Sequence, residues 1–167
     1  MKYTVKIPKI RARLLLKNEG KLKKKFEEIA NVKIDVKEDE ISFECDDPVY
    51  AMSIKQVLIA FGRGFDLDDA LNLLDEQYGL EIIDITDYVG KSKSRLVTMR
   101  GRIIGTDGKT KRTIENATGT KLSIFGKTVS ILGPWEKIPT AKRAVEMLLE
   151  GKMHNTVYRW LETHAYG

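Results

Sequence analysis

The segment that decides the fold runs from residue 102 to residue 124 and reads RIIGTDGKTKRTIENATGTKLSI. At its centre, Gly105-Thr106-Asp107-Gly108 separates residues 94–104, which are compatible with a helix, from a second stretch in which Ile114, Ala117 and Thr118 fall on one helical face. Gly119 is placed to end the second helix in a left-handed conformation. Glycines let backbone N–H groups approach a phosphate closely, and the N-terminus of the second helix directs its positive dipole there. Because a Gly-x-x-Gly tetrapeptide alone is a common turn, its context has to support the interpretation.

The elements around this loop are predicted in the order βααββα. An apolar run at 81–85 predicts a strand, and the alternation at 121–124 and 128–131 predicts a half-buried hairpin. Pro134 then opens an amphipathic helix that Gly151 closes. This order places the tetrapeptide between two helices and not between a strand and a helix.

An internal repeat appears when the sequence is shifted by 88 residues against itself: Gly20 falls on Gly108, Phe26 on Ile114 and Ile34 on Leu122. The period is that of a duplicated small domain and not of a solenoid. We therefore expect one copy over residues 1–64, a helical linker over 65–80 and a second copy over 81–167 that includes an additional C-terminal helix. The linker has a helical pattern, so the two copies are expected to pack together.

The charge is divided along the chain. The net charge of +5 resolves into +9 over residues 1–25, −13 over 26–90 and +9 over 91–167. Two basic blocks favour a polyanionic partner, most commonly nucleic acid, over the alternative of ordinary solvated helix faces. The sequence has neither a membrane span nor the apolar core of a signal peptide, which predicts a cytoplasmic protein with no membrane partner. Cys45, His154 and His164 are too few for a Cys/His metal cluster, so no metal or other cofactor is expected, and the histidines are interpreted as tail or packing residues.

Residues 102–124 closely resemble the signature of the KH domain, which has an apolar pair before Gly-x-x-Gly, an isoleucine in the next helix and a Thr-Gly turn before the next strand. The resemblance implies that about four nucleotides of single-stranded RNA lie in a groove beside the loop. For Ile103, Ile104, Ile114, Leu122 and Ile124, the groove floor and simple core packing remain equal alternatives. The RNA-binding residues that the resemblance implies are Arg102, Ile103, Ile104, Gly105, Thr106, Asp107, Gly108, Lys109, Lys111, Arg112, Leu122 and Ile124.

The chain as a whole is similar to the two-KH proteins of small-subunit ribosome assembly, in particular to their archaeal counterparts. The resemblance is carried by residues 62–65, 80–85, 133–135 and 154–158. It implies an α+β fold of two tandem type I KH domains, and a monomeric factor that binds the 3′ region of small-subunit rRNA. The implied protein partners are rRNA-maturation enzymes, namely the Nob-type endonuclease and the rRNA dimethylase, or other ribosome and translation proteins.

The first copy departs from this pattern because Lys17 stands where the second has Gly105, and Glu19 adds a repelling charge. We expect this copy not to bind RNA in the usual way. Its basic residues could contact phosphates, a protein partner or only solvent. This secondary basic face comprises Arg11, Arg13, Lys17, Lys21, Lys23, Lys24 and Lys25.

The sequence argues against two enzymatic interpretations and leaves one rival to RNA binding. A Walker A loop needs a glycine five positions before Gly108, and that position is Ile103, so a nucleotide hydrolase is not expected. A metal-dependent nuclease would need clustered carboxylates, but the acidic group at 66–76 is better explained by helix capping and solvation. No catalytic residue is predicted, and the chain is not expected to be an enzyme. The rival is a protein-interaction scaffold or translation-linked adaptor whose KH domains mainly recruit protein partners.

Overall fold

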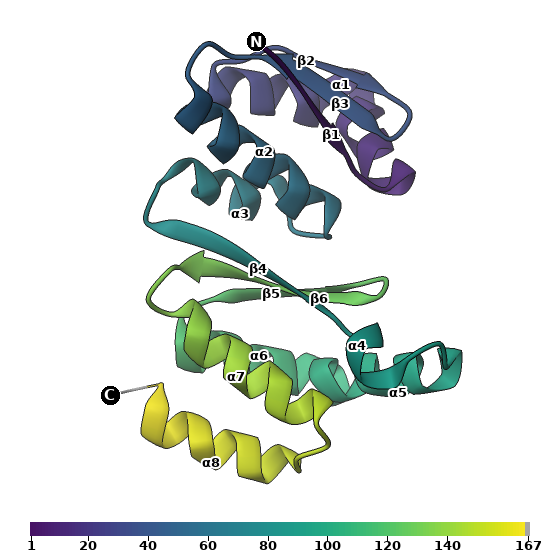
Figure 1. Cartoon of the computed structure of the whole chain (residues 1–167), viewed down its shortest axis with the longest axis vertical. Helices are drawn as coiled ribbons and strands as arrows, with labels where there is room; N and C mark the ends of the chain where they lie inside the picture. The colour runs from purple at the N-terminus through teal and green to yellow at the C-terminus, as the bar shows by residue number, and fades with distance from the viewer. Residues whose placement is uncertain (166–167) are drawn as a thin grey trace. The chain divides into compact units, whose positions relative to one another are not determined.

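The computed structural model describes residues 1–165 and divides the chain into two compact units, Met1–Tyr78 and the residues from Gly79 onward. Each unit contains a three-stranded sheet with helices packed against it (Figure 1). The predicted α+β class is confirmed. Within the described residues, no helix combines the length and the apolar character needed to cross a bilayer.

The first unit is built on an antiparallel sheet of order β1-β3-β2, in which Val5 pairs with Ile41 and Ile34 with Phe43. These four side chains are buried, because the polar–apolar alternation of each strand turns one face toward the helices. The elements are β1 (Lys2–Lys6), α1 (Lys9–Ala30), β2 (Ile34–Lys37), β3 (Glu40–Glu44), α2 (Pro48–Gly62), α3 (Leu67–Leu71) and the 3₁₀ turn η1 (Asn72–Leu74).

The segment expected to be a helical linker, 65–80, is divided between the two units. Leu67, Ala70 and Leu73 of α3 and η1 are buried within the first unit. Strand β4 begins at Tyr78, before the predicted start at Glu81. The sequence pattern that predicts a turn and a helix in this segment is local. Which unit the segment belongs to depends instead on the core in which its apolar side chains are buried.

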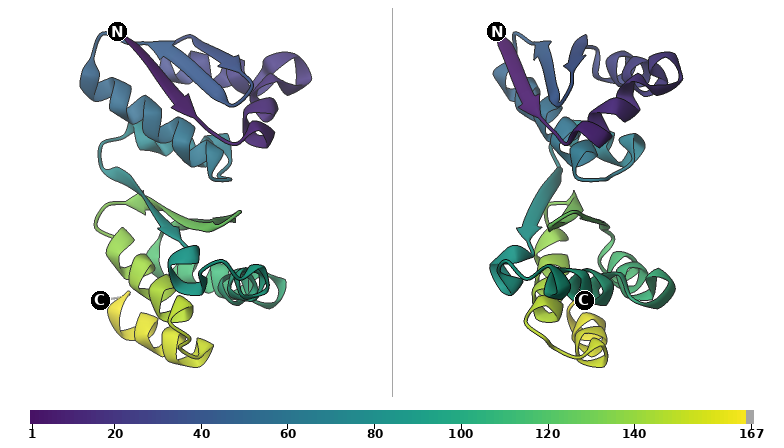
Figure 2. Two further views of the ribbon diagram at one scale, coloured as in Figure 1. Left: turned by 45° about the vertical axis from the view of Figure 1, so that its right-hand side comes forward. Right: turned by 90° about the vertical axis from the view of Figure 1, so that its right-hand side faces the viewer.

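The second unit has a sheet of order β4-β6-β5, with α5, α6 and α7 on one side of it and α8 beyond them (Figures 1 and 2). Its core includes Ile83, Ile114, Val129 and Val145. The elements are β4 (Tyr78–Asp84), α4 (Thr86–Val89), α5 (Lys93–Ile104), the 3₁₀ turn η2 (Thr106–Gly108), α6 (Lys109–Thr118), β5 (Lys121–Phe125), β6 (Thr128–Pro134), α7 (Ile138–Leu149) and α8 (His154–His164).

Two details of the second unit differ from expectation. Pro134 does not open a helix but ends β6, and α7 begins at Ile138 with Pro139 in its first turn. The short helix α4 was not predicted. It is held by Asp84, whose carboxylate accepts hydrogen bonds from the Thr86 amide at 2.9 Å and the Thr86 hydroxyl at 2.6 Å.

Positions 88 residues apart have the same structural role in both units. Asn31 and Gly119 end their helices in the left-handed conformation, with φ of 55° and 70°. Phe26 and Ile114, one turn earlier, are both fully buried. The two sheets also have the same strand order, so the sequence offset corresponds to a repeated arrangement of elements.

Candidate nucleic-acid interface

The loop between α5 and α6 has a backbone that requires glycine. Gly105, Asp107 and Gly108 have φ of 77°, 53° and 74°. A Cβ at Gly105 would lie 2.3 Å from Oγ1 and 2.6 Å from the backbone N of Thr110, so a larger residue cannot occupy this position without displacing α6. The first glycine of the tetrapeptide therefore allows the two helices to meet closely.

The polar groups of the loop face solvent. Thr106, Asp107, Lys109 and Arg112 are exposed, and Lys111 is half-buried. The Arg112 guanidinium donates from Nη1 to the Asp107 carbonyl at 2.5 Å, so it stabilises the loop in addition to presenting charge. The three basic residues stand in the first turns of α6, at the positive end of its dipole, where they offset the Asp107 carboxylate.

The apolar candidates divide into two groups. Ile103 and Ile114 are fully buried and Leu122 is 3% exposed, so these three side chains belong to the core. Ile104, which directly precedes the loop, and Ile124 on β5 are only half-buried. Burial therefore assigns Ile103, Ile114 and Leu122 to the core, and leaves Ile104 and Ile124 as the candidates for the groove floor.

Sequence reasoning missed two surface residues on α5. Val97 is 68% exposed, and with Gly101 and Ile104 it forms a stripe at i, i+4 and i+7 that leads to Gly105. A Cβ added at Gly101 would meet no atom within 4 Å among the described residues. A glycine in a helix interior lowers stability, and no packing contact within the described residues requires one at position 101. The helical spacing of 97, 101 and 104 was the signal available in the sequence.

Arg102 does not point toward the loop surface. Its guanidinium donates from Nη1 to the Leu148 carbonyl at 2.8 Å and from Nη2 to the Lys152 carbonyl at 2.6 Å. The residue implied as an RNA contact therefore holds the C-terminal end of α7.

The corresponding loop of the first unit is a break within α1. Glu19 and Gly20, with φ of 60° and 76°, repeat the conformation of Asp107 and Gly108. Lys17 instead has φ of −63° and ψ of 154°, whereas Gly105 has φ of 77°. Gly105 combines its positive φ with a ψ of 171°, a conformation that is essentially restricted to glycine, so only the second half of the loop is retained in the first unit.

The secondary basic face is partly occupied by contacts within the first unit. Arg11 donates to the carbonyls of Phe61 and Phe65, both at 2.8 Å, and burial lowers its pKa while nearby Asp66 opposes that effect. Lys23 pairs with Glu27 at 3.6 Å, and Lys25 pairs with Asp68. The side chains of this face that are exposed and for which the described residues show no ion pair are Arg13, Lys17, Lys21 and Lys24.

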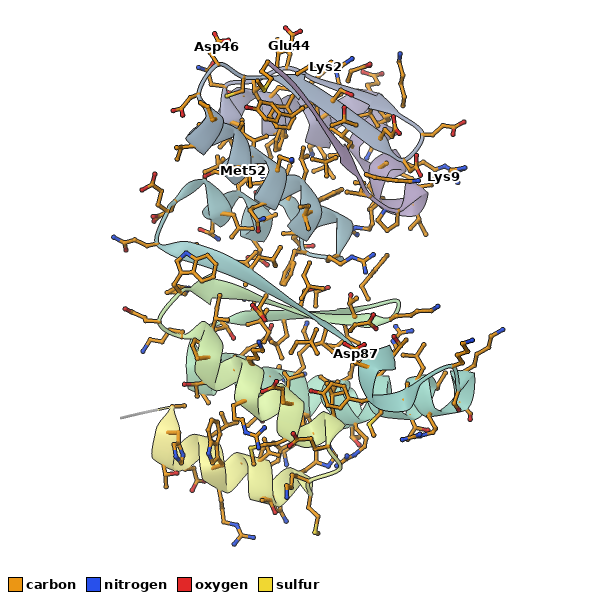
Figure 3. All side chains as sticks on the ribbon, in the orientation of Figure 1. Lys2, Lys9, Glu44, Asp46, Met52 and Asp87 are labelled. Atoms are coloured by element: carbon orange, nitrogen blue, oxygen red, sulfur yellow. The ribbon has the colours of Figure 1, made fainter. Side chains whose placement is uncertain are left out.

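An open groove of about 930 Å³ lies in the first unit between the end of α1 and the sheet. Its lining mixes both signs of charge and includes Lys24, Lys33, Glu28 and Glu44. Lys2 and Glu44, which are labelled in Figure 3, belong to the same lining. In residues 1–165, no group of three or more His, Cys, Asp or Glu residues could hold a metal ion.

Comparisons with known proteins agree with this geometry. The model of the eukaryotic type KH domain (KH-domain type I), for the second such domain of PNO1, matches residues 79–166. The KH domain-containing protein MJ0443 of Methanocaldococcus jannaschii is 39% identical over 95% of this chain and 71% of its own length. The pre-rRNA-processing protein PNO1 of Gibberella zeae is 42% identical over 64% of this chain, which spans only 42% of that protein.

A solved structure is similar over nearly the whole chain. The crystal structure of an a/eIF2alpha–aDim2p–rRNA complex from Pyrococcus horikoshii contains a chain with a TM-score of 0.88 and 38% identity, covering 99% of this chain and 94% of that one. Since the KH model covers more than half of the sequence and MJ0443 aligns along almost all of it, the chain belongs to the family of PNO1- and Dim2p-like KH-domain proteins.

Proposed function

We propose that the chain binds single-stranded RNA along the Gly105–Gly108 loop and the Val97–Gly101–Ile104 stripe of α5. The observation that carries this proposal is the loop itself. Its positive-φ glycines bring the two helices together, and the basic residues Lys109, Lys111 and Arg112 stand at the N-terminus of α6. The stripe beside it offers an apolar surface on which unpaired bases can lie.

The RNA that we propose is the 3′ region of small-subunit rRNA, bound during maturation of the small ribosomal subunit. Support comes from the relatives: PNO1 proteins are described as pre-rRNA-processing proteins, and aDim2p was crystallised with rRNA. Both units would be type I KH domains in tandem, the first degenerate at Lys17. The protein would act as a cytoplasmic monomer, by binding and without catalysis or a cofactor, and its partners would be the Nob-type endonuclease, the rRNA dimethylase or translation proteins.

A second candidate function is that of an adaptor whose first unit recruits a protein. The mixed-charge groove favours it, because a surface with lysines and glutamates side by side repels a phosphate chain in part but complements a protein surface. The two functions are compatible, one in each unit.

Fluorescence anisotropy tests the RNA function. A labelled single strand with the 3′-terminal sequence of small-subunit rRNA should bind more tightly than the same sequence in a perfect duplex, because a narrow groove cannot admit a paired strand. A plot of the logarithm of affinity against the logarithm of salt concentration should have a negative slope of about 0.7 for each phosphate contact. Equal affinity for the single strand and the duplex, or no binding of the single strand, would refute RNA binding in this groove. Crosslinking to total RNA followed by sequencing tests the proposed rRNA region separately.

A further inference from the structure

The C-terminal helix α8 contacts both helices that flank the loop. At its first residue, the His154 ring nitrogen Nε2 lies 2.9 Å from the Arg102 carbonyl oxygen, in the last turn of α5. One turn later, the Tyr158 hydroxyl shares a hydrogen bond of 3.0 Å with the Thr110 hydroxyl, in the first turn of α6. His154 and Tyr158 are four residues apart and therefore lie on one face of α8. Their rings are 6.2 Å apart.

The contact at the end of α5 is reciprocal. The last carbonyls of a helix have no partner within it. The Gly101 carbonyl accepts a hydrogen bond from the Gly105 amide at 2.8 Å, and the next carbonyl, that of Arg102, bonds to the His154 ring. Since a carbonyl only accepts, Nε2 of His154 carries the hydrogen. The Arg102 side chain in return donates to the Leu148 and Lys152 carbonyls at the junction of α7 and α8.

The contact at the start of α6 reaches the first glycine of the loop. Thr110 is 2% exposed, and its backbone N and Oγ1 lie where a Cβ of Gly105 would be. The Tyr158 hydroxyl is therefore separated from the Gly105 backbone by one side chain. Because Val157 and Leu161 are buried in the core of the second unit, α8 itself is firmly anchored.

We propose that Tyr158 and His154 are positioning residues of the RNA site, and that α8 braces the ends of α5 and α6 at one separation. This inference rests on the proposed RNA function. This brace, formed by the Tyr158–Thr110 and His154–Arg102 contacts, holds the loop amides in the conformation that binds phosphate. The loop is therefore ordered before RNA binds. A loop without the brace has to be ordered at the moment of binding, and its affinity falls.

The first variant removes one oxygen. Tyr158→Phe keeps the ring and its packing but leaves the Thr110 hydroxyl without its partner. We expect affinity for the single-stranded RNA to fall about three- to tenfold, the usual range for one lost hydrogen bond. Tyr88→Phe is the matched control, since Tyr88 packs against the same core, and it should bind within about twofold of the parent. Tyr158→Phe with parental affinity would overturn the proposal.

Two further measurements separate positioning from general stability. Amide hydrogen exchange in Tyr158→Phe should accelerate at Thr106–Lys109 and stay parental in β5 and β6; acceleration throughout the unit would contradict a local brace. Thr110→Val should lower RNA affinity to a similar extent, and the double variant should lose no more than either single variant. Full additivity of the two losses would show that Tyr158 does not act through Thr110.

The histidine provides a second, independent arm. His154→Leu should weaken RNA binding, and His154→Gln should restore part of the affinity because its amide also donates; equal affinities for the two variants would count against the brace. Thr106→Asp distinguishes this failure from that of the proposed function. If the parent binds RNA, Thr106→Asp abolishes binding and Tyr158→Phe changes nothing, only the brace is wrong. If the parent does not bind or Thr106→Asp binds normally, the loop is not the RNA site and both proposals fail.

Discussion

The carboxylate of Glu115 accepts the backbone N–H of Leu122 at 2.8 Å and ties the last turns of α6 to the start of β5. In the first unit, Glu27 accepts the N–H of Ile34 at the same distance. Each glutamate lies seven residues before its partner, across a left-handed helix end, and the two pairs are 88 residues apart. The same side chain has thus been kept in the same structural role in both units, although their loops have diverged.

Replacement of Glu115 by alanine leaves the partly buried Leu122 amide unpaired. We expect the free energy of unfolding to fall by about 1–3 kcal/mol, measured by urea denaturation. Glu162→Ala, on the exposed face of α8, is the control and should change it by no more than about 0.5 kcal/mol. Unchanged stability in Glu115→Ala would mean that water replaces the carboxylate without loss.

Replacement of Thr106 by aspartate places a second carboxylate beside Asp107 in an exposed turn. RNA affinity should fall by at least about tenfold, equivalent to 1.4 kcal/mol, because the added charge repels phosphate. Asn18→Asp is the matched control, since Asn18 stands at the equivalent position of the first unit's loop. The melting temperature should shift by only a few degrees in either variant. Normal RNA binding by Thr106→Asp would make the loop an ordinary helix connector.

Simultaneous alanine replacement of Lys109, Lys111 and Arg112 should weaken RNA binding more than replacement of Lys23, Lys24 and Lys25. Two of the latter three already pair with carboxylates of the first unit. The slope of log affinity against log salt should also become shallower by about 0.7 for each lost contact. Anisotropy titrations at several salt concentrations measure both quantities. The reverse ranking would locate the main RNA surface on the degenerate copy.

Alanine substitutions at Gly101, inside α5, and at Gly105, directly after α5, should have opposite effects on stability. Gly101→Ala should stabilise the protein by about 0.5–1 kcal/mol, because it removes a flexible residue from a helix interior. Its methyl group should nevertheless weaken RNA binding if bases lie on the stripe. Gly105→Ala should lower both the stability and the RNA affinity. The new Cβ would clash with Thr110, and alanine disfavours the positive φ of this position. Thermal melts and RNA titrations of each variant check this, and parental RNA affinity in Gly101→Ala would exclude the stripe from the site.

Acid should weaken the turn that Asp84 and Thr86 form at the start of α4. Hydrogen bonds from the Thr86 hydroxyl and amide hold the pKa of Asp84 below its usual value. A carboxyl with a depressed folded-state pKa stabilises the fold above its unfolded pKa of about 4, and this contribution is lost as pH falls through the folded value. Asp84→Ala should therefore be less stable than the parent at pH 7, by less than about 1 kcal/mol because solvent screens this exposed carboxylate, with a smaller difference at pH 3. A difference that is independent of pH would show that the ionised carboxylate does not stabilise this turn.

Much of the fold could be predicted because its determinants are local. The helices on either side of Gly105–Gly108, the left-handed end at Gly119 and the hairpin of β5 and β6 each depend on residues within a few positions of one another. The offset that aligns Gly20 with Gly108 is likewise a property of the sequence alone. Element boundaries depend on more distant residues. Pro134 is compatible with the end of a strand and with the start of a helix, and pairing of β6 with its neighbouring strands places it at the end of a strand.

The sequence by itself determined the class of fold, the repeated order of elements and the position of the glycine loop, because periodicity and backbone preference act over short distances. Only the tertiary structure decided which side chains face the loop. Arg102 and Arg11 are basic residues near the two loops, yet their guanidinium groups bind carbonyls 46 to 54 residues away in the chain. Tyr158 meets Thr110 across 48 residues. A long side chain takes the partner that folding brings within reach, and residue spacing carries no record of that partner.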